Sequence, residues 1–198
     1  MASKRVIVDT GVYEYEPGDL RHYVRSTRAH NTISIDGDEQ SEIWGEFRIG
    51  RRAKKHFSSI KHVADGVCII GEYSGFYGNT IGFQSRFTHH RSINVKLVKD
   101  AIDTMTVVDK LTGKGAHTVE SYVHFHPDFS AHIDDDNTVT LKCHEDDFAV
   151  LSVDSHCEAR IEKTIYCPEF GLKQPIDCLV ISRFAVFPTE LSYRLQRF

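Results

Sequence analysis

The chain has 198 residues, of which 40% are hydrophobic and 26% are charged, and its formal net charge is −4. This length and composition predict a single domain over residues 1–198 and exclude a collagen repeat, a coiled coil and wholesale disorder. No apolar run approaches the roughly 20 residues of a membrane-spanning helix, so we expect no membrane insertion. The acidic balance argues against a nucleic-acid partner, because binding to phosphates usually needs a basic face. The chain is rich in histidine, with 12 residues, and composition alone does not show whether any of them is functional.

The first 60 residues hold the more unusual local patterns. Pro17–Thr27 is the one segment with a partly helical pattern, with Leu20 and Tyr23 on one side. Thr32–Ile35 alternates as a strand does, and the following Asp36-Gly37 is typical of the turn that closes one. We expect the chemistry in this part of the chain or at its edge.

From about residue 60 onward the chain is a succession of short runs rich in Val, Ile, Thr and aromatic residues, separated by polar or glycine-containing turns. The predicted strands are Val67–Tyr73, Ser92–Leu97, Asp103–Val108, His117–His126, Thr138–Cys143, Phe148–Val153, Ala159–Cys167 and Cys178–Phe187. Their spacing favours hairpins and meanders over β-α-β units. We therefore predict an all-β fold with little helix, an antiparallel β-sandwich of two packed sheets.

His30 and Asn31 are the candidate catalytic residues, because they stand at the entrance of the strand that starts at Thr32. A neutral imidazole there can accept a proton near neutral pH. Arg25 and Arg28 are close by in sequence, and an adjacent arginine is expected to lower the pKa of His30 and favour a base. The alternative is a structural pair that caps backbone groups.

Basic residues crowd the first quarter of the chain. They are Arg21, Arg25, Arg28, Arg48, Arg51, Arg52, Lys54 and Lys55. Such a cluster is either a solvated face or a site for an anionic ligand. In the second case Arg25, Arg28, Arg51 and Arg52 are the candidate substrate contacts.

A metal site is a weaker possibility. His124 and His126 fall on one face of a predicted strand, and such a pair can bind a metal if a third ligand such as His90 comes from a neighbouring strand. Histidines of the core or of an interface explain the same spacing. The chain has no GxSxG, P-loop, GxGxxG or HExxH pattern, which excludes the common serine-hydrolase, nucleotide-binding and zincin motifs.

Several segments in order resemble the C-terminal β-sheet domain of the heparinase II/III-like polysaccharide lyases. The segments are Val8–Tyr13, Arg25–Thr32, Asp36-Gly37, Gln40–Trp44, Arg48–Ala53, His90–Ser92, Val107–Leu111 and Phe125–Pro127. The likeness covers about residues 6–130, and the rest fits further sandwich strands, so the resemblance implies a supersandwich-like fold.

The resemblance also implies a function. Such lyases cleave uronic-acid-containing polysaccharides, for example glycosaminoglycans or alginate, by β-elimination at a cleft between a helical toroid domain and the sheet domain. The motif match identifies His30 as the histidine that the sheet domain contributes, and Arg25 and Arg28 as contacts to carboxylate or sulfate. The partners implied are an acidic polysaccharide and a toroid of the same parent protein. We expect the toroid to be absent here, and the chain to be inactive alone, since no run of amphipathic helices precedes Val6.

Some relatives hold zinc through a second histidine two positions after the catalytic one. Here that position is Thr32, so we expect no cofactor, with zinc the one alternative. The resemblance implies a bacterial protein that is periplasmic or secreted, although Val6–Val8 is too short for a signal-peptide core. Two other functions stay open: a non-catalytic module or scaffold that binds an acidic glycan, and a metal-dependent jelly-roll enzyme.

Overall fold

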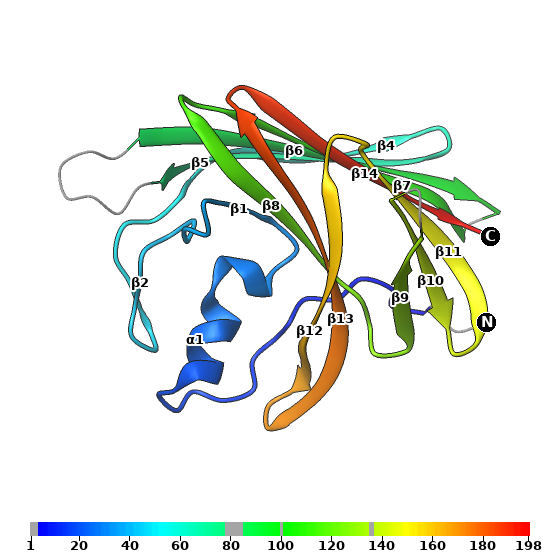
Figure 1. Ribbon diagram of the computed structural model, residues 1–198, viewed down its shortest axis with the longest axis horizontal. Coiled ribbons are helices and arrows are strands. Elements are labelled where there is room, and N and C mark those ends of the chain that lie inside the picture. The colour runs from blue at the N-terminus through cyan, green and yellow to red at the C-terminus, as the bar shows by residue number, and fades with distance from the viewer. Residues whose placement is uncertain (1–3, 78–84, 100, 135–136) are drawn as a thin grey trace.

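The computed structural model describes residues 4–77, 85–99, 101–134 and 137–198. Within these ranges two antiparallel sheets pack against each other, with a short helix at one side (Figure 1). The all-β sandwich prediction is therefore confirmed. The smaller sheet has the order β1 (Ile33–Ile35), β8 (Ala116–His124), β13 (Leu172–Val186) and β12 (Glu158–Glu169). The larger sheet has the order β4 (Lys54–Val63), β5 (Gly66–Tyr77), β6 (Ser85–Val98), β7 (Ala101–Thr112), β14 (Thr189–Arg197), β11 (Asp146–Val153), β10 (Thr138–Cys143) and β9 (Phe129–Ile133).

The main core lies between the two sheets, and strand alternation explains which residues fill it. On β13, Leu179 and Ile181 are buried in this core, while Val180 between them belongs to a second buried cluster. On β8, Val123 points into the main core and Tyr122 into the second cluster. Both faces of the smaller sheet are thus covered: one by the larger sheet and the other by the N-terminal segment.

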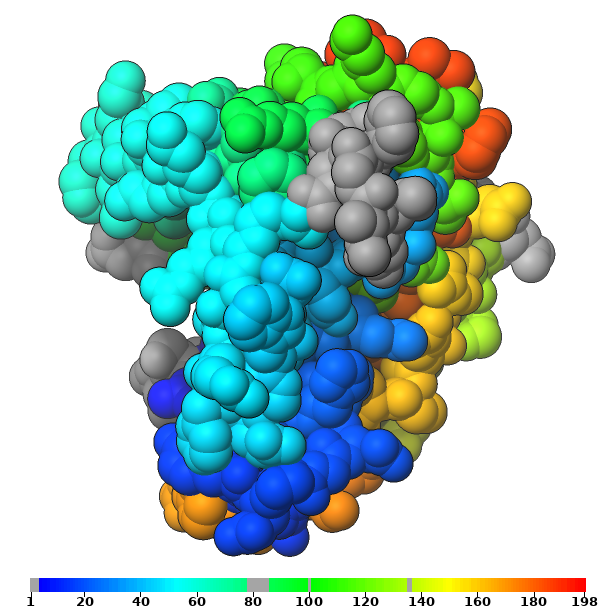
Figure 2. Space-filling view, turned by 90° about the vertical axis from the view of Figure 1, so that its left-hand side faces the viewer, coloured from blue at the N-terminus to red at the C-terminus, as the bar shows by residue number. Residues whose placement is uncertain are grey.

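The N-terminal segment covers the outer side of the smaller sheet. It contains helix α1 (Asp19–Arg25), the 3₁₀ helix η1 (Thr27–Ala29) and a hairpin of β2 (Ile43–Trp44) and β3 (Arg48–Ile49). Figure 2 shows that residues from the first part of the chain, blue to cyan, form much of one face of the molecule. In the described ranges no helix is long and apolar enough to cross a membrane.

Most elements predicted from the sequence are present with shifted bounds. The helix is shorter than Pro17–Thr27, because Ser26 is already extended (φ −71°, ψ 155°). Asp36 and Gly37 adopt positive φ, 53° and 74°, in the tight turn that was predicted. Strand β8 ends at His124, so His126, the last residue of the predicted strand His117–His126, lies outside the observed one. Strands β2, β3, β4, β9 and β14 were not predicted.

Candidate active site

His30 lies in the connection between η1 and β1. Its main-chain N–H donates to the carbonyl oxygen of Thr27 at 3.2 Å, and the preceding Ala29 is fully buried. The backbone of His30 is extended (φ −124°, ψ 157°). This hydrogen bond and the burial of Ala29 hold the main chain of the 3₁₀ turn in place, while 41% of the His30 side chain is exposed to solvent.

Asp9 is the partner of His30, although the two residues are far apart in sequence. A carboxylate oxygen of Asp9 lies 2.7 Å from Nδ1 of His30. The hydrogen bond from His30 to Asp9 raises the pKa of His30 above its ordinary value, although partial burial opposes the shift. Burial works to raise the pKa of Asp9, but the hydrogen bonds from His30 and from the Gly11 N–H outweigh it, so the pKa is lowered. The pair therefore favours an ionised Asp9 and a protonated His30.

The expectation that an arginine lowers the pKa of His30 is wrong, because the nearby arginines turn elsewhere. The guanidinium of Arg28 pairs with Glu162 of β12 at 2.6 Å. Arg25 donates to the carbonyl oxygens of Gly45 and Arg48 and so holds the β2–β3 hairpin. Asp9, a carboxylate, dominates the electrostatics of the His30 ring instead.

Asn31 connects the N-terminal segment to strand β8. Its Nδ2 donates to the carbonyl oxygen of Val8 at 2.8 Å, and its Oδ1 accepts from the main-chain N–H of His124 at 2.8 Å. Both ends of its amide are therefore engaged with the main chain. This geometry gives Asn31 a structural task beside His30, and its catalytic role stays a prediction.

His124 is buried behind Asn31. Its Nδ1 lies 3.2 Å from Oδ1 of Asn31, and its Nε2 is buried without a hydrogen-bond partner among the described residues. Burial lowers the pKa of His124 to about 4. The ring is therefore neutral at physiological pH and is closed off from solvent.

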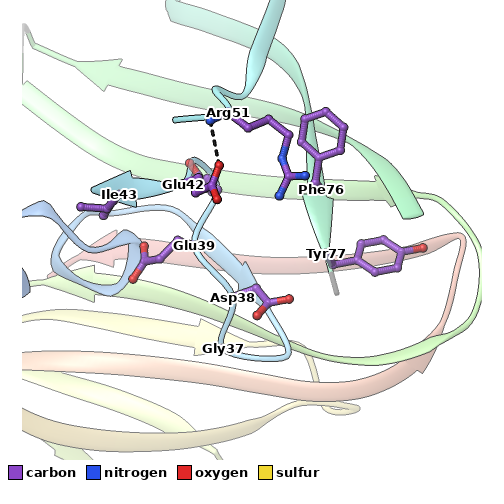
Figure 3. A pocket seen from close by; sticks show the side chains of 9 residues that line it. Gly37, Asp38, Glu39, Glu42, Ile43, Arg51, Phe76 and Tyr77 are labelled. Carbon is purple, nitrogen blue, oxygen red and sulfur yellow. Dashed lines mark hydrogen bonds between the residues drawn. The ribbon is translucent and has the colours of Figure 1, made fainter. Parts of the chain in front are cut away.

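The four predicted substrate arginines do not converge. Arg25 ends α1 and Arg28 lies within η1, whereas Arg52 is exposed after β3 and Arg51 lies over the ring of Phe76 at 4.6 Å. Arg51 lines a pocket of about 230 Å³ beside the Asp36-Gly37 turn, shown in Figure 3. The residues lining it are Gly37, Asp38, Glu39, Gln40, Glu42, Ile43, Arg51, Phe76 and Tyr77. Three carboxylates beside one guanidinium do not favour an anionic ligand in this pocket.

Residues 1–193 match the family described as Heparinase II/III-like, C-terminal. The chain belongs to this family. No match was found among curated proteins. Two solved structures of heparan sulfate lyase HepC from Pedobacter heparinus are similar, a mutant with TM-score 0.71 and 15% identity and another with TM-score 0.68 and 13% identity. The heparinase III BT4657 gene product has TM-score 0.62 and 12% identity. Each comparison covers 98% of this chain and 28% of the other chain, so the chain spans less than a third of these proteins.

The zinc that some heparinase II/III-like relatives hold does not fit the residues present here. The hydroxyl of Thr32 accepts a hydrogen bond at 2.7 Å from the amide Nε2 of Gln40, which also donates to the carbonyl oxygen of Ile33 at 2.9 Å. The position two residues after His30 is thus occupied by a hydroxyl bonded to an amide, and both are poor zinc ligands. Among the described residues no group of three or more His, Cys, Asp or Glu could hold a metal ion.

The weaker histidine set is likewise not brought together. His90 faces Glu72 at 3.3 Å, on the sheet face opposite to that of its neighbour His89. His124 is buried against Asn31, and His126 lies 3.4 Å from Asp128. The three rings have separate partners, so the structure gives no support to a site built from them.

A buried ion-pair network beneath the site was not predicted. Arg91 on β6 donates through Nε and Nη2 to the two carboxylate oxygens of Asp109 on β7, at 2.6 and 2.7 Å, and through Nη1 to the carbonyl oxygen of Asn31. Nε2 of His89 lies 2.6 Å from the same carboxylate. Arg91 and Asp109 stand in the segments that carry the family resemblance, but their mutual contact depends on the register of two strands. The network ties the His30 turn to the larger sheet.

Proposed function

We propose that this chain is the β-sheet domain of a polysaccharide lyase that cleaves uronic-acid-containing polysaccharide by β-elimination. Its family supports this function, as does its similarity to heparan sulfate lyase and heparinase III structures. Because the chain spans about 28% of those proteins, we further propose that a helical domain of the same protein completes the site. The isolated chain is then inactive or nearly so.

The reaction makes three demands on an active site. A base removes the weakly acidic proton at C5 of the uronate, and a donor neutralises the charge that develops on the carboxylate. A proton must also reach the O4 oxygen as the glycosidic bond breaks. Groups that meet these demands must face the substrate and have a suitable charge near neutral pH.

The observation that carries the proposal is the half-exposed His30 ring held by Asp9. Nδ1 is occupied by Asp9, and Nε2 makes no hydrogen bond to any residue in the described part of the chain. With the pKa of His30 raised by Asp9, a larger fraction of the ring is cationic near neutral pH. His30 therefore acts as the proton donor, and the base that removes the C5 proton comes from the helical domain.

Arg28 is the basic side chain best placed to assist. Its side chain is 54% exposed although it is paired with Glu162. Its positive charge also helps to lower the pKa of His124, next to the site. A guanidinium can bind a carboxylate or sulfate in bidentate fashion. Binding of the polysaccharide would then compete with Glu162 for Arg28.

The test uses the full-length protein that contains this chain and a panel of uronate polymers, including heparan sulfate and alginate. We expect unsaturated uronate products, detected by their ultraviolet absorbance. His30→Ala should lower the rate at least about 100-fold, as expected for loss of a general acid. The control is His156→Ala, since His156 is 74% exposed and pairs with Asp154 in an equivalent way.

Two outcomes contradict the proposal. Unchanged turnover of a folded His30→Ala variant removes His30 from the mechanism. Binding of uronate polymers without any unsaturated product indicates instead the non-catalytic glycan-binding module.

A further inference from the structure

In the part of the chain that the structure describes, the Asp9 carboxylate makes hydrogen bonds only within its own loop and to His30. Among the described residues its hydrogen bonds go to Nδ1 of His30, at 2.7 Å, and to the main-chain N–H of Gly11, at 3.1 Å. Its side chain is 57% exposed, so the packing of the core does not explain why an acidic residue stands here. An acidic residue that is exposed and points at a histidine suggests a role in setting the state of that ring.

The loop that carries Asp9 is held firmly in place. Val8 donates to the carbonyl oxygen of His124 at 3.0 Å, and Cys167 donates to that of Thr10 at 2.7 Å. Gly11 has φ +76°, and a Cβ there would lie 2.2 Å from the carbonyl oxygen of Cys167. The carboxylate of Asp9 is thus presented by a backbone that β8 and β12 anchor on either side.

The direction of the hydrogen bond follows from chemistry. An ionised carboxylate can only accept, so the hydrogen lies on Nδ1 of His30. In the neutral ring, the second nitrogen, Nε2, then carries the free lone pair, and in the cation it carries the second N–H. In both states Nε2 is the nitrogen left to exchange a proton with a ligand.

We propose that Asp9 is the positioning residue of His30, which holds the ring through Nδ1–H and so makes Nε2 the nitrogen that faces the substrate. The pairing stands on the geometry alone, and its use in catalysis rests on the proposed lyase function. Asp9 is not a catalytic residue in this scheme, since it acts through His30.

The other charged groups around His30 do not replace Asp9. Glu39 makes a smaller contribution that also raises the pKa of His30. His124 is held neutral by burial, and the guanidinium of Arg28 is paired with Glu162. Removal of the Asp9 charge should therefore lower the pKa of His30 even though Glu39 remains.

The test is nitrogen NMR of the His30 ring across a pH titration, in the wild-type chain and in Asp9→Asn. In the wild type we expect the neutral ring to carry its hydrogen on Nδ1. In Asp9→Asn we expect the amide oxygen to keep the hydrogen bond from the Gly11 N–H, so that the NH₂ group faces Nδ1 of His30 and donates to it. The neutral ring should then change to the Nε2–H tautomer, and its pKa should fall. The matched control is Asp154→Asn, because Asp154 also accepts from a main-chain N–H and pairs with an exposed histidine, His156. This control should leave His30 unchanged.

The same variants in the full-length protein show whether catalysis uses the pair. Asp9→Asn should lower kcat at least about 10-fold and change the pH profile, as expected when a base or acid is held in the wrong tautomer. A wild-type ring that is Nε2–H when neutral overturns the proposal without any variant. An unchanged tautomer and pKa in Asp9→Asn overturn it as well. If no lyase activity exists but the tautomer changes as expected, the positioning role stands and the proposed function fails.

Discussion

The buried ion pair of Arg91 and Asp109 gives the sharpest test of the forces that hold the site. Asp109 is 1% exposed and Arg91 is 16% exposed. Replacement of Arg91 by Met keeps much of the aliphatic volume but removes both hydrogen bonds to the carboxylate and the one to Asn31. Among the described side chains, the buried carboxylate of Asp109 then keeps only its contact with Nε2 of His89.

Two arguments set the size of the effect. Breaking a buried pair by removal of one partner costs about 3–5 kcal/mol. In the wild type, burial works to raise the pKa of Asp109, but Arg91, with a smaller contribution from His89, outweighs it and lowers the pKa from 3.8 to about 2. That difference corresponds to about 2 kcal/mol of folding free energy at neutral pH. We therefore expect Arg91→Met to lower the free energy of unfolding by about 3 kcal/mol or more.

The sign of the pH dependence is part of the prediction. A lowered carboxyl pKa stabilises the wild type above the unfolded pKa of Asp109, and this stabilisation is lost as the pH falls toward about 2. In Arg91→Met, His89 is the remaining group that lowers the pKa of Asp109 against the effect of burial, so this pKa rises and protonation of Asp109 at low pH removes the buried charge. The difference in stability between wild type and Arg91→Met should thus shrink as the pH falls below about 4.

Urea unfolding followed by circular dichroism, at neutral and acidic pH, measures these free energies. The control is Arg194→Met, which changes an exposed arginine on β14 and should cost within about 0.5 kcal/mol. The double variant Arg91→Met, Asp109→Leu should lose less than Arg91→Met alone, because no buried charge remains. A loss below about 1 kcal/mol for Arg91→Met, or a loss independent of pH, would refute the reasoning.

Three further predictions follow from the site. Gly11→Ala should destabilise the fold by about 2 kcal/mol more than Gly37→Ala, measured by urea unfolding, because both have positive φ but a Cβ on Gly37 meets nothing within 4 Å; equal losses would show that the contact with Cys167 is relieved cheaply. A metal chelator should leave the melting temperature unchanged, because the Thr32–Gln40 hydrogen bond occupies the position of the relatives' zinc ligand; a lowered melting temperature would mean that a metal supports the fold. Since the cation of His30 is the proposed donor and Asp9 raises its pKa, kcat/KM of the full-length protein should fall as the pH rises through that pKa, whereas a rising rate would make His30 a base.

The local pattern of the sequence was sufficient for much of the fold. Runs such as Thr138–Cys143 alternate so regularly that the predicted and observed strands coincide. The Asp36-Gly37 turn was equally predictable from the sequence, because few residue pairs tolerate two consecutive positive φ angles. Strand β4 was missed because it is an edge strand, exposed along most of its length, and its polar sequence lacks the hydrophobic signal of a half-buried strand.

The residues of the candidate site were also only partly predictable from the sequence. His30 and its neighbouring arginines were found because they share one short motif. The role assumed for those arginines was wrong in one respect, since their charges are directed at Glu162 and at the β2–β3 hairpin. Sequence proximity gives no information on where a long, flexible side chain ends.

By itself, the sequence determined the fold class, the family motifs and the identity of the candidate histidine, because these depend on residue type and on spacing along the chain. Only the tertiary structure decided what surrounds that histidine. Asp9 precedes His30 by 21 positions, and Arg91 follows Asn31 by 60. Their contacts arise from how the N-terminal segment lies on β8 and from the register of β6 with β7. The protonation state of His30 is therefore a property of the folded chain, since the charge that sets it comes from a segment that only folding brings near.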